Sequence, residues 1–295
     1  MGAVDLNGLI VCAVCHSDLP LEAIRRNDVG LCPSCGQRYT CTDGVLDMTP
    51  HSLSDEVLKS RWSLWEKLQA NGLISYTQAP EFNLTVAPRE DGRAFREFCH
   101  FSGLILDVGC GPQRSPSHLP EGGHVVGLDP LIGEQPREFA FVRGIGEYLP
   151  FRSGSFDHIV FVGSLDHMLD PRRALREAER CLKPNGSINL KIGADDTDST
   201  SGGISRWGQY LTLAQKGLKT LTRPGWISML GWRRTLSYLY TMARMKVPEG
   251  ATDYFHFEHL SATTIESWLS ESNFAILRKE PFAPSDMLFI QAKKR

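Results

Sequence analysis

LILDVGCGP (Leu104 to Pro112) is an apolar run that contains Asp107 and ends in a turn rich in glycine. The apolar part has the length and character of a buried β-strand. Gly109 and Gly111 carry no Cβ, so the backbone after this strand can approach a ligand closely. In an open α/β sheet, such a ligand lies outside the carboxyl ends of the strands. The stretch therefore predicts a binding site at one edge of a parallel sheet.

Short β-rich runs alternate with helical or turn segments over residues 103–200, as in a parallel sheet with helices on both faces. The expected strands are Leu104–Val108, His124–Leu128, Ala140–Val142, Asp157–Val162 and Ser187–Ile192. A helix at Thr263–Ser270 and strands at Phe274–Lys279 and Met287–Ala292 follow. The last two strands need no long crossover, so they are expected to form an antiparallel edge hairpin. We expect an α/β, Rossmann-like and mostly parallel sheet of seven strands.

The 295 residues divide into three regions of different character. Residues 1–50 are rich in cysteine, whereas residues 51–100 carry apolar residues at helical spacing and predict a linker of one or two helices. Residues 101–295 hold the expected sheet, interrupted at 203–248 by a basic, aromatic insert of helical character. We therefore expect a small N-terminal domain, a helical linker and an α/β domain that carries an insert.

Composition narrows the class of protein without identifying it. With 41% hydrophobic and 22% charged residues, the chain has ample material for a packed core. A net charge of −2 argues against a globally basic nucleic-acid binder, although a local basic patch is compatible with it. The start of the chain does not resemble a signal peptide, and no uncharged apolar stretch approaches the ~18 residues of a membrane span. We expect a cytoplasmic protein that can still touch a membrane surface.

Two C-x2-C knuckles stand near the N-terminus, sixteen residues apart. Their sulfurs belong to Cys12, Cys15, Cys32 and Cys35. Paired knuckles complete the tetrahedral shell of a zinc ion, which would stabilise a segment too short to bury a core of its own. His16 and Cys41 are possible substitute ligands, but the spacing favours the knuckle sulfurs, and four coincidental buried or redox cysteines are the alternative. We expect a zinc ribbon whose closed, structural site leaves no open position for catalysis.

The ribbon sequence resembles the small zinc-ribbon activator subunit of tRNA and rRNA methyltransferases. In that family a tyrosine follows the second knuckle, and an Asp-Gly-Ile/Val-Pro-like ending comes after it. Here Tyr39 and Asp43-Gly44-Val45 occupy those places. A similar ribbon precedes the catalytic domain of a bacterial rRNA guanine methyltransferase. The resemblance implies a fold more strongly than it implies a role.

Two acids at strand ends bracket the expected ligand. A dinucleotide-binding fold requires G-x-G-x-x-G, but Arg114 stands at the third glycine position. Asp107 would repel a pyrophosphate, whereas it suits a cofactor with a cationic, amino-bearing end. Asp129 ends the second strand, where an acid accepts hydrogen bonds from ribose hydroxyls. The pair predicts an adenosine with an amino-acid tail; a tight turn and a capping aspartate are the alternative.

Residues 104–193 resemble class I S-adenosylmethionine-dependent methyltransferases of type 11, including the ubiquinone-biosynthesis type. The matching segments are Leu149-Pro150-Phe151, Ser155-Phe156-Asp157, His167, Asp170-Pro171 and Leu182-Lys183-Pro184-Asn185-Gly186. The family often places an acid for the adenine amino group where this chain has Ile145, which leaves the Gly146 backbone and Glu147 for that contact. The resemblance implies cofactor binding by Asp107, Gly109, Gly111, Asp129, Gly146, Glu147 and Ser164. The order Cys-Gly-Pro-Gln followed by Gly-Leu-Asp-Pro-Leu also resembles methyltransferases of surface-polysaccharide pathways.

The candidate catalytic residues lie beyond the strand at Asp157–Val162 and before the last helix. Methyl transfer depends mainly on alignment of the acceptor, and an oxygen or nitrogen acceptor can also need a base. His167 is the first candidate, as base or as an orienting donor, with Asp166 beside it and His256 from the later segment. The alternatives are that His167 packs or lines the cofactor pocket, that Asp166 caps a helix, and that His256 and His259 belong to a plain helix start.

The insert holds eight basic residues and no acid. Three interpretations remain open: a lid for a phosphate-bearing or lipid-linked acceptor at a membrane surface, an RNA-contacting patch, or a solvated helical cap.

We expect an S-adenosylmethionine-dependent methyltransferase acting on a small-molecule or glycan acceptor, on oxygen. One alternative is a tRNA or rRNA methyltransferase that uses the ribbon and insert to bind RNA. Against it, Gly163-Ser164-Leu165 stands where an Asn-Pro-Pro-Tyr-like motif would present a base nitrogen. The other alternative is a non-catalytic partner of another methyltransferase.

Overall fold

A computed structural model describes residues 4–53, 55–78, 90–133, 137–193, 240, 245–282 and 287–295. Most of the insert at 203–248 lies outside these residues, and so do the expectations about its lid, RNA-binding or capping role. Among the helices that are described, none is both long and apolar enough to cross a membrane.

The N-terminal region folds around one short helix and three strands. The helix α1 spans Leu21–Asn27, and the antiparallel strands β1, β2 and β3 span Val29–Leu31, Arg38–Thr42 and Val45–Asp47. Asp43 and Gly44 both have a positive φ, which closes the hairpin between β2 and β3 in the way that a short Asp-Gly turn allows. Tyr39 of β2 and Leu46 of β3 are both buried, so these two strands contribute side chains to the hydrophobic core.

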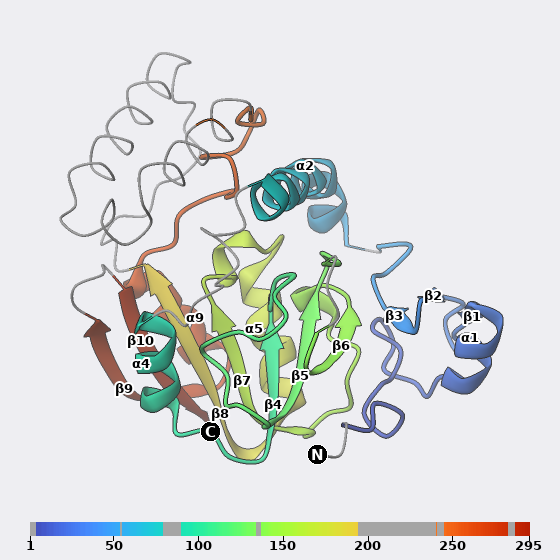
Figure 1. Cartoon of the computed structure of the whole chain (residues 1–295), viewed down its shortest axis with the longest axis horizontal. Coiled ribbons are helices and arrows are strands. Elements are labelled where there is room, and N and C mark those ends of the chain that lie inside the picture. Colours follow the sequence, from blue (N-terminus) through green and yellow to red (C-terminus); the bar gives the residue numbers. More distant parts are fainter. Residues whose placement is uncertain are drawn as a thin grey trace.

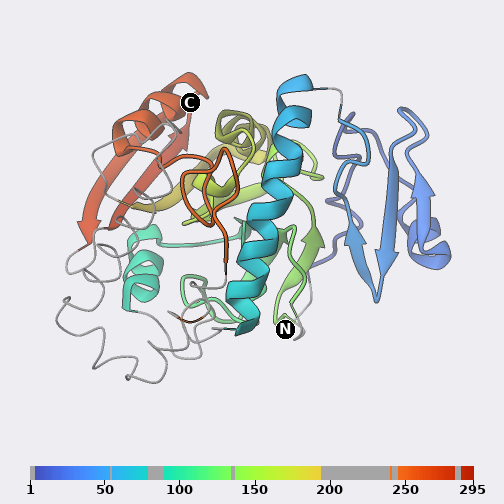
Figure 2. The same cartoon turned by 90° about the horizontal axis from the view of Figure 1, so that it is seen from above.

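Two helices occupy the segment expected to be a linker. The long helix α2 spans Glu56–Gln78, and it buries Leu58, Trp65 and Leu68 along one face. In Figures 1 and 2, α2 runs across the carboxyl ends of the central strands, so it covers the sheet edge as well as connecting two regions. The helix α4 spans Glu90–Cys99 and packs Phe95 against Phe289 of the last strand, with ring centroids 5.2 Å apart.

The strands of the α/β region lie close to their expected positions. They are β4 Leu104–Val108, β5 His124–Asp129, β6 Ala140–Arg143, β7 Phe156–Val162, β8 Leu182–Gly193, β9 Phe274–Phe282 and β10 Met287–Lys294. Across the sheet they follow the order β6-β5-β4-β7-β8-β10-β9, and β6 through β8 are parallel. The strand β10 is antiparallel to both β8 and β9, as expected for a terminal hairpin. The strand order reverses at β4, which makes the β4 end the switch point where ligands bind.

The prediction of seven strands was wrong, because the described residues form a sheet of ten: the seven expected strands are present, and three strands of the N-terminal region join them. The strand β3 pairs in parallel with β6 through Asp47 and Arg143, and so adds β1, β2 and β3 to the sheet. Arg143 donates from Nη1 to Asp47 Oδ2 at 2.8 Å, and its carbonyl accepts from Met48 N at 2.8 Å. The free edge of β6 is thereby covered, as the unpaired N–H and C=O groups of an edge strand require.

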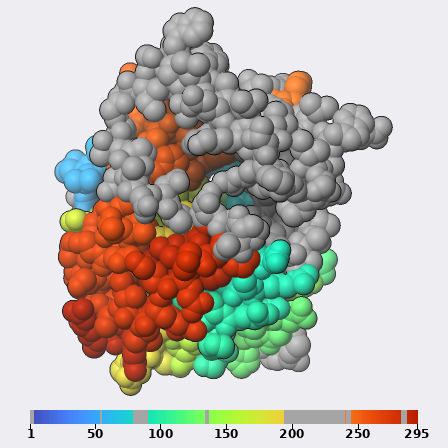
Figure 3. Space-filling view, turned by 90° about the vertical axis from the view of Figure 1, so that its left-hand side faces the viewer, coloured from blue at the N-terminus to red at the C-terminus, as the bar shows by residue number. Residues whose placement is uncertain are grey.

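Helices cover both faces of the sheet. The helices α5 (Pro171–Cys181) and α9 (Ala262–Glu271) lie on one face and α4 on the other (Figure 1). Asp170 caps α5 by accepting from Arg173 N at 3.1 Å, so the capping role that was open for Asp166 belongs to Asp170. Ser261 caps α9 by accepting from Thr264 N at 3.1 Å. Figure 3 shows the side of the molecule where the C-terminal strands lie next to α4.

Candidate active site

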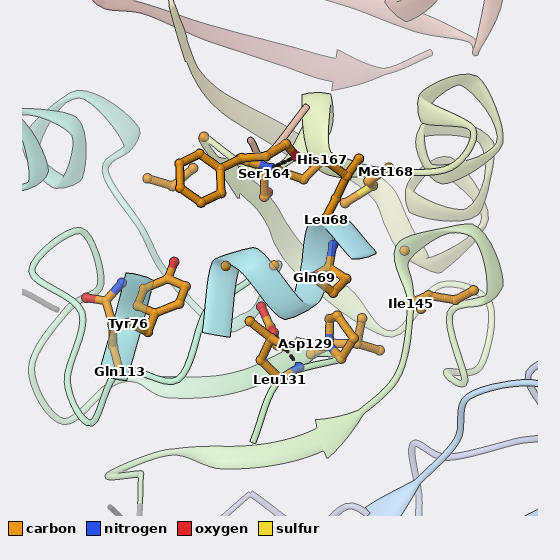
Figure 4. A pocket seen from close by; sticks show the side chains of 18 of the residues that line it. Leu68, Gln69, Tyr76, Gln113, Asp129, Leu131, Ile145, Ser164, His167 and Met168 are labelled. Carbon is orange, nitrogen blue, oxygen red and sulfur yellow. Dashed lines mark hydrogen bonds between the residues drawn. The ribbon is translucent and has the colours of Figure 1, made fainter. Parts of the chain in front are cut away.

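A cavity of about 350 Å³ lies at the carboxyl ends of β4, β5 and β7, beneath α2. Residues expected to act on the cofactor or acceptor come together in its lining, namely Gly109, Asp129, Gly146, Glu147, Ser164, His167 and His256. Figure 4 shows Asp129 and Leu131 on one side of this cavity and Ser164 and His167 on the opposite side. Asp166 lines a small adjoining cavity of about 50 Å³.

Neither glycine of the turn after β4 can readily be replaced by a residue with a side chain. Gly109 has a φ of +78°, and a Cβ there would lie 2.4 Å from the Cβ of Ser164. Gly111 has a φ of +67°, a conformation that L-residues with side chains rarely adopt. Ser164 holds the turn from the β7 side, because its hydroxyl donates to the Val108 carbonyl at 2.6 Å. Gly109 is therefore required by the close packing of Ser164 at the cavity floor, and Gly111 by its backbone conformation.

Asp107 is fully buried next to the cavity, and its two carboxylate oxygens differ in their hydrogen bonding. Oδ2 lies 2.9 Å from Nε2 of His118, a buried residue that the sequence analysis missed. Oδ1 is buried and has no hydrogen-bond partner among the described residues. A buried, unsatisfied carboxylate oxygen costs free energy, so such an atom is unusual without a bound donor. Asp107 therefore fits a ligand that carries an amino or ammonium group.

Asp129 is held at the end of β5 by two backbone N–H groups. Gly111 N donates to Oδ2 at 2.7 Å, and Leu131 N donates to Oδ1 at 2.8 Å (Figure 4). Burial raises the pKa of Asp129 to about 6, while these two hydrogen bonds oppose that rise. A carboxylate accepts about four hydrogen bonds, so two lone-pair directions remain for hydroxyl donors.

The short helix η1 (Gly146–Tyr148) forms the wall beside β6. A Cβ on Gly146 would lie 2.8 Å from Met168 Sδ, which explains the glycine. Glu147 accepts from Leu169 N at 2.5 Å and from Asp170 N at 3.1 Å, so its carboxylate ties η1 to the start of α5. Burial raises the pKa of Glu147 to about 7. A cofactor contact by Glu147 stays a prediction.

Several cavity residues escaped the sequence analysis because they come from distant segments. Trp65, Gln69 and Tyr76 reach the cavity from α2, where helical periodicity signals only a buried face. Lys191 of β8 and Asp91 of α4 form a buried ion pair in the cavity lining. The available signal was Lys191 itself, a charged residue between the apolar Leu190 and Ile192.

Three imidazoles and two carboxylates gather at the acceptor side. Asp166 and His167 belong to the short helix η2 (Leu165–His167), and His256 comes from the loop before α9. The rings of His167 and His256 lie 4.3 Å apart between centroids. His256 Nε2 is 3.4 Å from Asp166 Oδ2. The structure thus brings the three predicted catalytic residues together.

Asp253 joins this cluster, although the sequence analysis did not single it out. Its Oδ1 lies 2.8 Å from His256 Nδ1, and its Oδ2 lies 3.2 Å from His259 Nε2. Burial alone would raise the pKa of Asp253, but hydrogen bonds from His256 and His259 hold it well below its usual range. Asp253 is therefore an ionised acceptor that orients both imidazoles.

The knuckle cysteines form a compact group at the base of the N-terminal region. All four sulfurs lie within 4.8 Å of one another, with Cys12–Cys35 and Cys15–Cys32 separations of 3.5 Å. Four sulfurs at ~2.3 Å from a tetrahedral zinc lie about 3.8 Å apart, so the donor set fits this metal. The group consists of Cys12, Cys15, Cys32 and Cys35, without His16 or Cys41. Nε2 of His16 instead lies 3.7 Å from Oε2 of Glu177.

The chain matches known methyltransferases over its α/β region. Residues 106–190 match the family model described as a methyltransferase domain. Over 154 residues the chain is 27% identical to a ubiquinone biosynthesis O-methyltransferase of Erwinia tasmaniensis, covering 45% of this chain and 62% of the relative. Over 125 residues it is 30% identical to a demethylmenaquinone methyltransferase of Streptomyces griseus, covering 40% of this chain and 51% of the relative. The chain thus spans less than two thirds of either relative.

A solved structure supports the fold over a longer part of the chain. The 1,6-didemethyltoxoflavin-N1-methyltransferase of Burkholderia thailandensis, solved with 1,6-didemethyltoxoflavin and S-adenosylhomocysteine, superimposes with a TM-score of 0.50 and 13% identity. The similarity covers 89% of this chain and 97% of that one. At this identity the likeness shows a shared Rossmann-like fold.

Proposed function

We propose that this chain, whose residues 106–190 match a methyltransferase domain, transfers a methyl group from S-adenosylmethionine to an oxygen atom of a small molecule. The observation that carries the proposal is the cavity itself. Asp129, with two remaining lone-pair directions, lines the cofactor end, and Asp107, with its unsatisfied Oδ1, lies behind the lining next to His118. The imidazoles of His167 and His256 lie at the acceptor end.

The residues at the cofactor end suit the two polar parts of S-adenosylmethionine. Asp129 would accept hydrogen bonds from the ribose hydroxyls, and Asp107 would face the amino group of the methionine part. The glycine turn lets the ligand lie against the backbone, while Ile145, Gly146 and Met168 provide an apolar wall for adenine. The Burkholderia thailandensis enzyme binds S-adenosylhomocysteine on a similar fold, which supports this assignment.

The acceptor end suits a molecule with a hydroxyl group. His167 Nδ1 lies 3.0 Å from the Phe255 carbonyl and donates to it, so Nε2 carries the lone pair. Such an imidazole can orient a hydroxyl or receive its proton. The names of the two relatives support a small-molecule acceptor, and a glycan hydroxyl belongs to the same chemical class.

The cysteine group would hold one zinc ion in a purely structural role. Four thiolates close the coordination shell, so no position remains for a substrate. Tyr39 supports this site, because its hydroxyl lies 3.1 Å from Cys12 Sγ and accepts from Ala13 N at 3.1 Å. The ribbon would thus stabilise the β6 edge of the sheet.

Calorimetric titration with S-adenosylhomocysteine tests the cofactor assignment. We expect micromolar binding, near −8 kcal/mol, and a loss of at least ~1.5 kcal/mol in Asp129→Ala because a hydrogen bond to a charged group is removed. Glu121→Ala, an exposed acid outside the cavity, serves as the matched control and should bind like the wild type. Unchanged affinity in Asp129→Ala would place the ribose elsewhere and remove the main support for the proposal.

A radiolabelled methyl-transfer assay then separates the acceptor classes. Hydroxylated aromatic compounds, sugar nucleotides and total tRNA or rRNA are offered in parallel. Methylation of a small hydroxyl compound is the expected result, and stable incorporation into RNA alone would favour the RNA alternative.

A further inference from the structure

We propose that Asp166, His167 and His256 bind a divalent transition-metal ion of the zinc, cobalt or iron type at the acceptor end of the cavity. One ligand atom from each residue can be chosen so that all three lie within 4.8 Å of one another. The inference rests on the proposed function, since the ion would hold the oxygen acceptor of the methyl transfer. It concerns a site separate from the cysteine group.

Each imidazole in this triad has a hydrogen-bond partner on the nitrogen that faces away from Asp166. His167 donates from Nδ1 to the Phe255 carbonyl at 3.0 Å. His256 donates from Nδ1 to Asp253 Oδ1 at 2.8 Å. Histidines that ligate metals almost always donate their other N–H to a carbonyl or carboxylate in this way, which fixes the tautomer and aims the lone pair. Nε2 is therefore the acceptor nitrogen of each ring, and each Nε2 lies near an oxygen of Asp166.

The spacing of the three donors is close to that of a coordination shell. His256 Nε2 lies 3.4 Å from Asp166 Oδ2, and His167 Nε2 lies 3.9 Å from Asp166 Oδ1. Ligands bound ~2.1 Å from one metal ion lie about 3.0 to 3.4 Å apart. The side chains of Asp166 and His167 are each about a third exposed, so an ion can enter from solvent.

Two imidazoles and one carboxylate form a site with open positions. Such three-ligand sets suit zinc or iron and leave room for water or substrate, in contrast to four thiolates. His167 and His256 line the main cavity, so an open position on the ion faces the space for the acceptor. The site thus faces the same cavity as Gly109 and Ser164.

A metal ion in this place would activate a hydroxyl acceptor. Coordination lowers the free energy needed to break the acceptor O–H bond, and the proton passes to solvent water. The resulting oxygen anion forms the new O–CH₃ bond while the S–CH₃ bond of the sulfonium breaks. The products are the methylated acceptor and S-adenosylhomocysteine, with no redox change.

A second group of donors shares His256 and must be distinguished from the first. Asp253, His256 and His259 also lie within 4.8 Å of one another. In the structure His256 Nδ1 is the atom that bonds Asp253, at 2.8 Å from Oδ1. Of the second group only His256 lines the main cavity, whereas both His167 and His256 of the triad line it, so an ion held by the triad faces the acceptor space more directly. The geometry therefore favours the triad of Asp166, His167 and His256.

Cobalt titration tests the site directly in the full chain that metal analysis shows to hold a single zinc ion, so that the cysteine group is filled and the triad is empty. Calorimetry and visible absorption together should show one Co²⁺ bound with nitrogen and oxygen ligands, and no thiolate charge-transfer band. His167→Ala should weaken Co²⁺ binding at least ~100-fold, since a direct ligand matters more than the 10- to 100-fold of an outer-shell partner. Asp166→Asn, which preserves side-chain size, should weaken binding at least ~10-fold and covers the case in which His167→Ala does not fold. His259→Ala is the matched control and should stay within about threefold of the wild type, because it removes a ring outside the triad.

Three results would overturn the inference. They are no Co²⁺ binding by the wild type, a thiolate band that shows exchange into the cysteine group alone, and a loss in His259→Ala that His167→Ala does not share. S-adenosylhomocysteine binding by the wild-type protein is measured in the same series. Normal cofactor binding without Co²⁺ binding rejects the metal site and leaves the proposed function standing, whereas absent cofactor binding rejects the proposed function itself.

Discussion

The buried acids around the cavity differ in how many hydrogen bonds their carboxylate oxygens accept from the protein. Asp129 and Glu147 each accept two backbone hydrogen bonds, whereas Asp107 keeps Oδ1 without a partner in the described part of the chain. The first two carboxylates are thus positioned by the fold itself. Asp107 differs from them in having one oxygen, Oδ1, that no described group bonds, whereas Asp129 has a carboxylate that is bonded but not saturated with hydrogen bonds.

Glu147 should make stability depend on pH. In the unfolded chain its carboxyl loses a proton near pH 4.5, and burial raises the folded-state pKa to about 7. Between these values the folded state holds a proton that the unfolded state has lost, so stability falls as pH rises. Glu147→Gln keeps an oxygen acceptor for Leu169 N and Asp170 N but cannot ionise. The free energy of unfolding of the wild type, relative to Glu147→Gln, should fall by on the order of 2 to 3 kcal/mol from pH 5 to pH 8.

Urea denaturation of both proteins at several pH values measures this difference, and contributions from other groups cancel in the comparison. A difference that stays constant across the range would contradict the raised pKa of Glu147.

The helix α2 contributes both to the hydrophobic core and to the lining of the cavity. Its buried face contributes Trp65 and Leu68 to the core, and the same face supplies part of the cavity lining. Asp55 starts this helix, because its Oδ1 accepts from Val57 N at 2.9 Å and from Leu58 N at 3.3 Å. The position of α2 above the cavity thus depends on the cap at its N-terminus and on the packing of its buried face.

Loss of this cap should destabilise the protein modestly. Asp55→Ala should lower the free energy of unfolding by about 1 kcal/mol, because two backbone N–H groups lose their acceptor. Asp55→Asn is the matched control, since asparagine caps helices about as well. Thermal or chemical denaturation distinguishes the two. Equal losses in both variants would instead assign the effect to the charge pairing of Asp55 with Arg173, 3.6 Å away.

At the scale of the whole molecule, the N-terminal region and the sheet share one core. Buried residues of the N-terminal region, such as Ile24 and Leu46, belong to the same apolar cluster as Phe151 and Leu128. The two regions also pair through Ile10 and Phe151, and Val11 N donates to the Pro150 carbonyl at 2.9 Å. The N-terminal region therefore cannot unfold without exposing part of the shared core.

Removal of the proposed ribbon zinc should affect the entire chain. Cys32→Ser should contain one zinc fewer and melt in a single transition at least ~5 °C lower, because metal ligation contributes folding free energy. Scanning calorimetry with metal analysis provides both readings. Two separate transitions, with the higher one unchanged, would show that the ribbon folds independently, and unchanged zinc content would reject the ligand assignment.

Short-range patterns were sufficient for much of the fold. Strand-length apolar runs, the glycine turn after Leu104–Val108 and the spacing of the four cysteines all reflect local chemistry, and the structure has strands or clusters at those places. Asp129 at the end of β5 was predictable for the same reason. The strands and the glycine turn depend on residues within a few positions of one another, and the cysteine cluster depends on two C-x2-C pairs whose spacing can be read directly from the sequence.

Only the tertiary structure decided the features that depend on distant contacts. The pairing of Asp47 with Arg143 made the sheet ten-stranded, and the crossing of α2 over the strand ends made a linker into a roof. His167 meets His256 although they are 89 positions apart, and Asp253 orients His256. Local patterns determine which strands and helices form, whereas the packing free energy of the whole chain determines which of their side chains share a site.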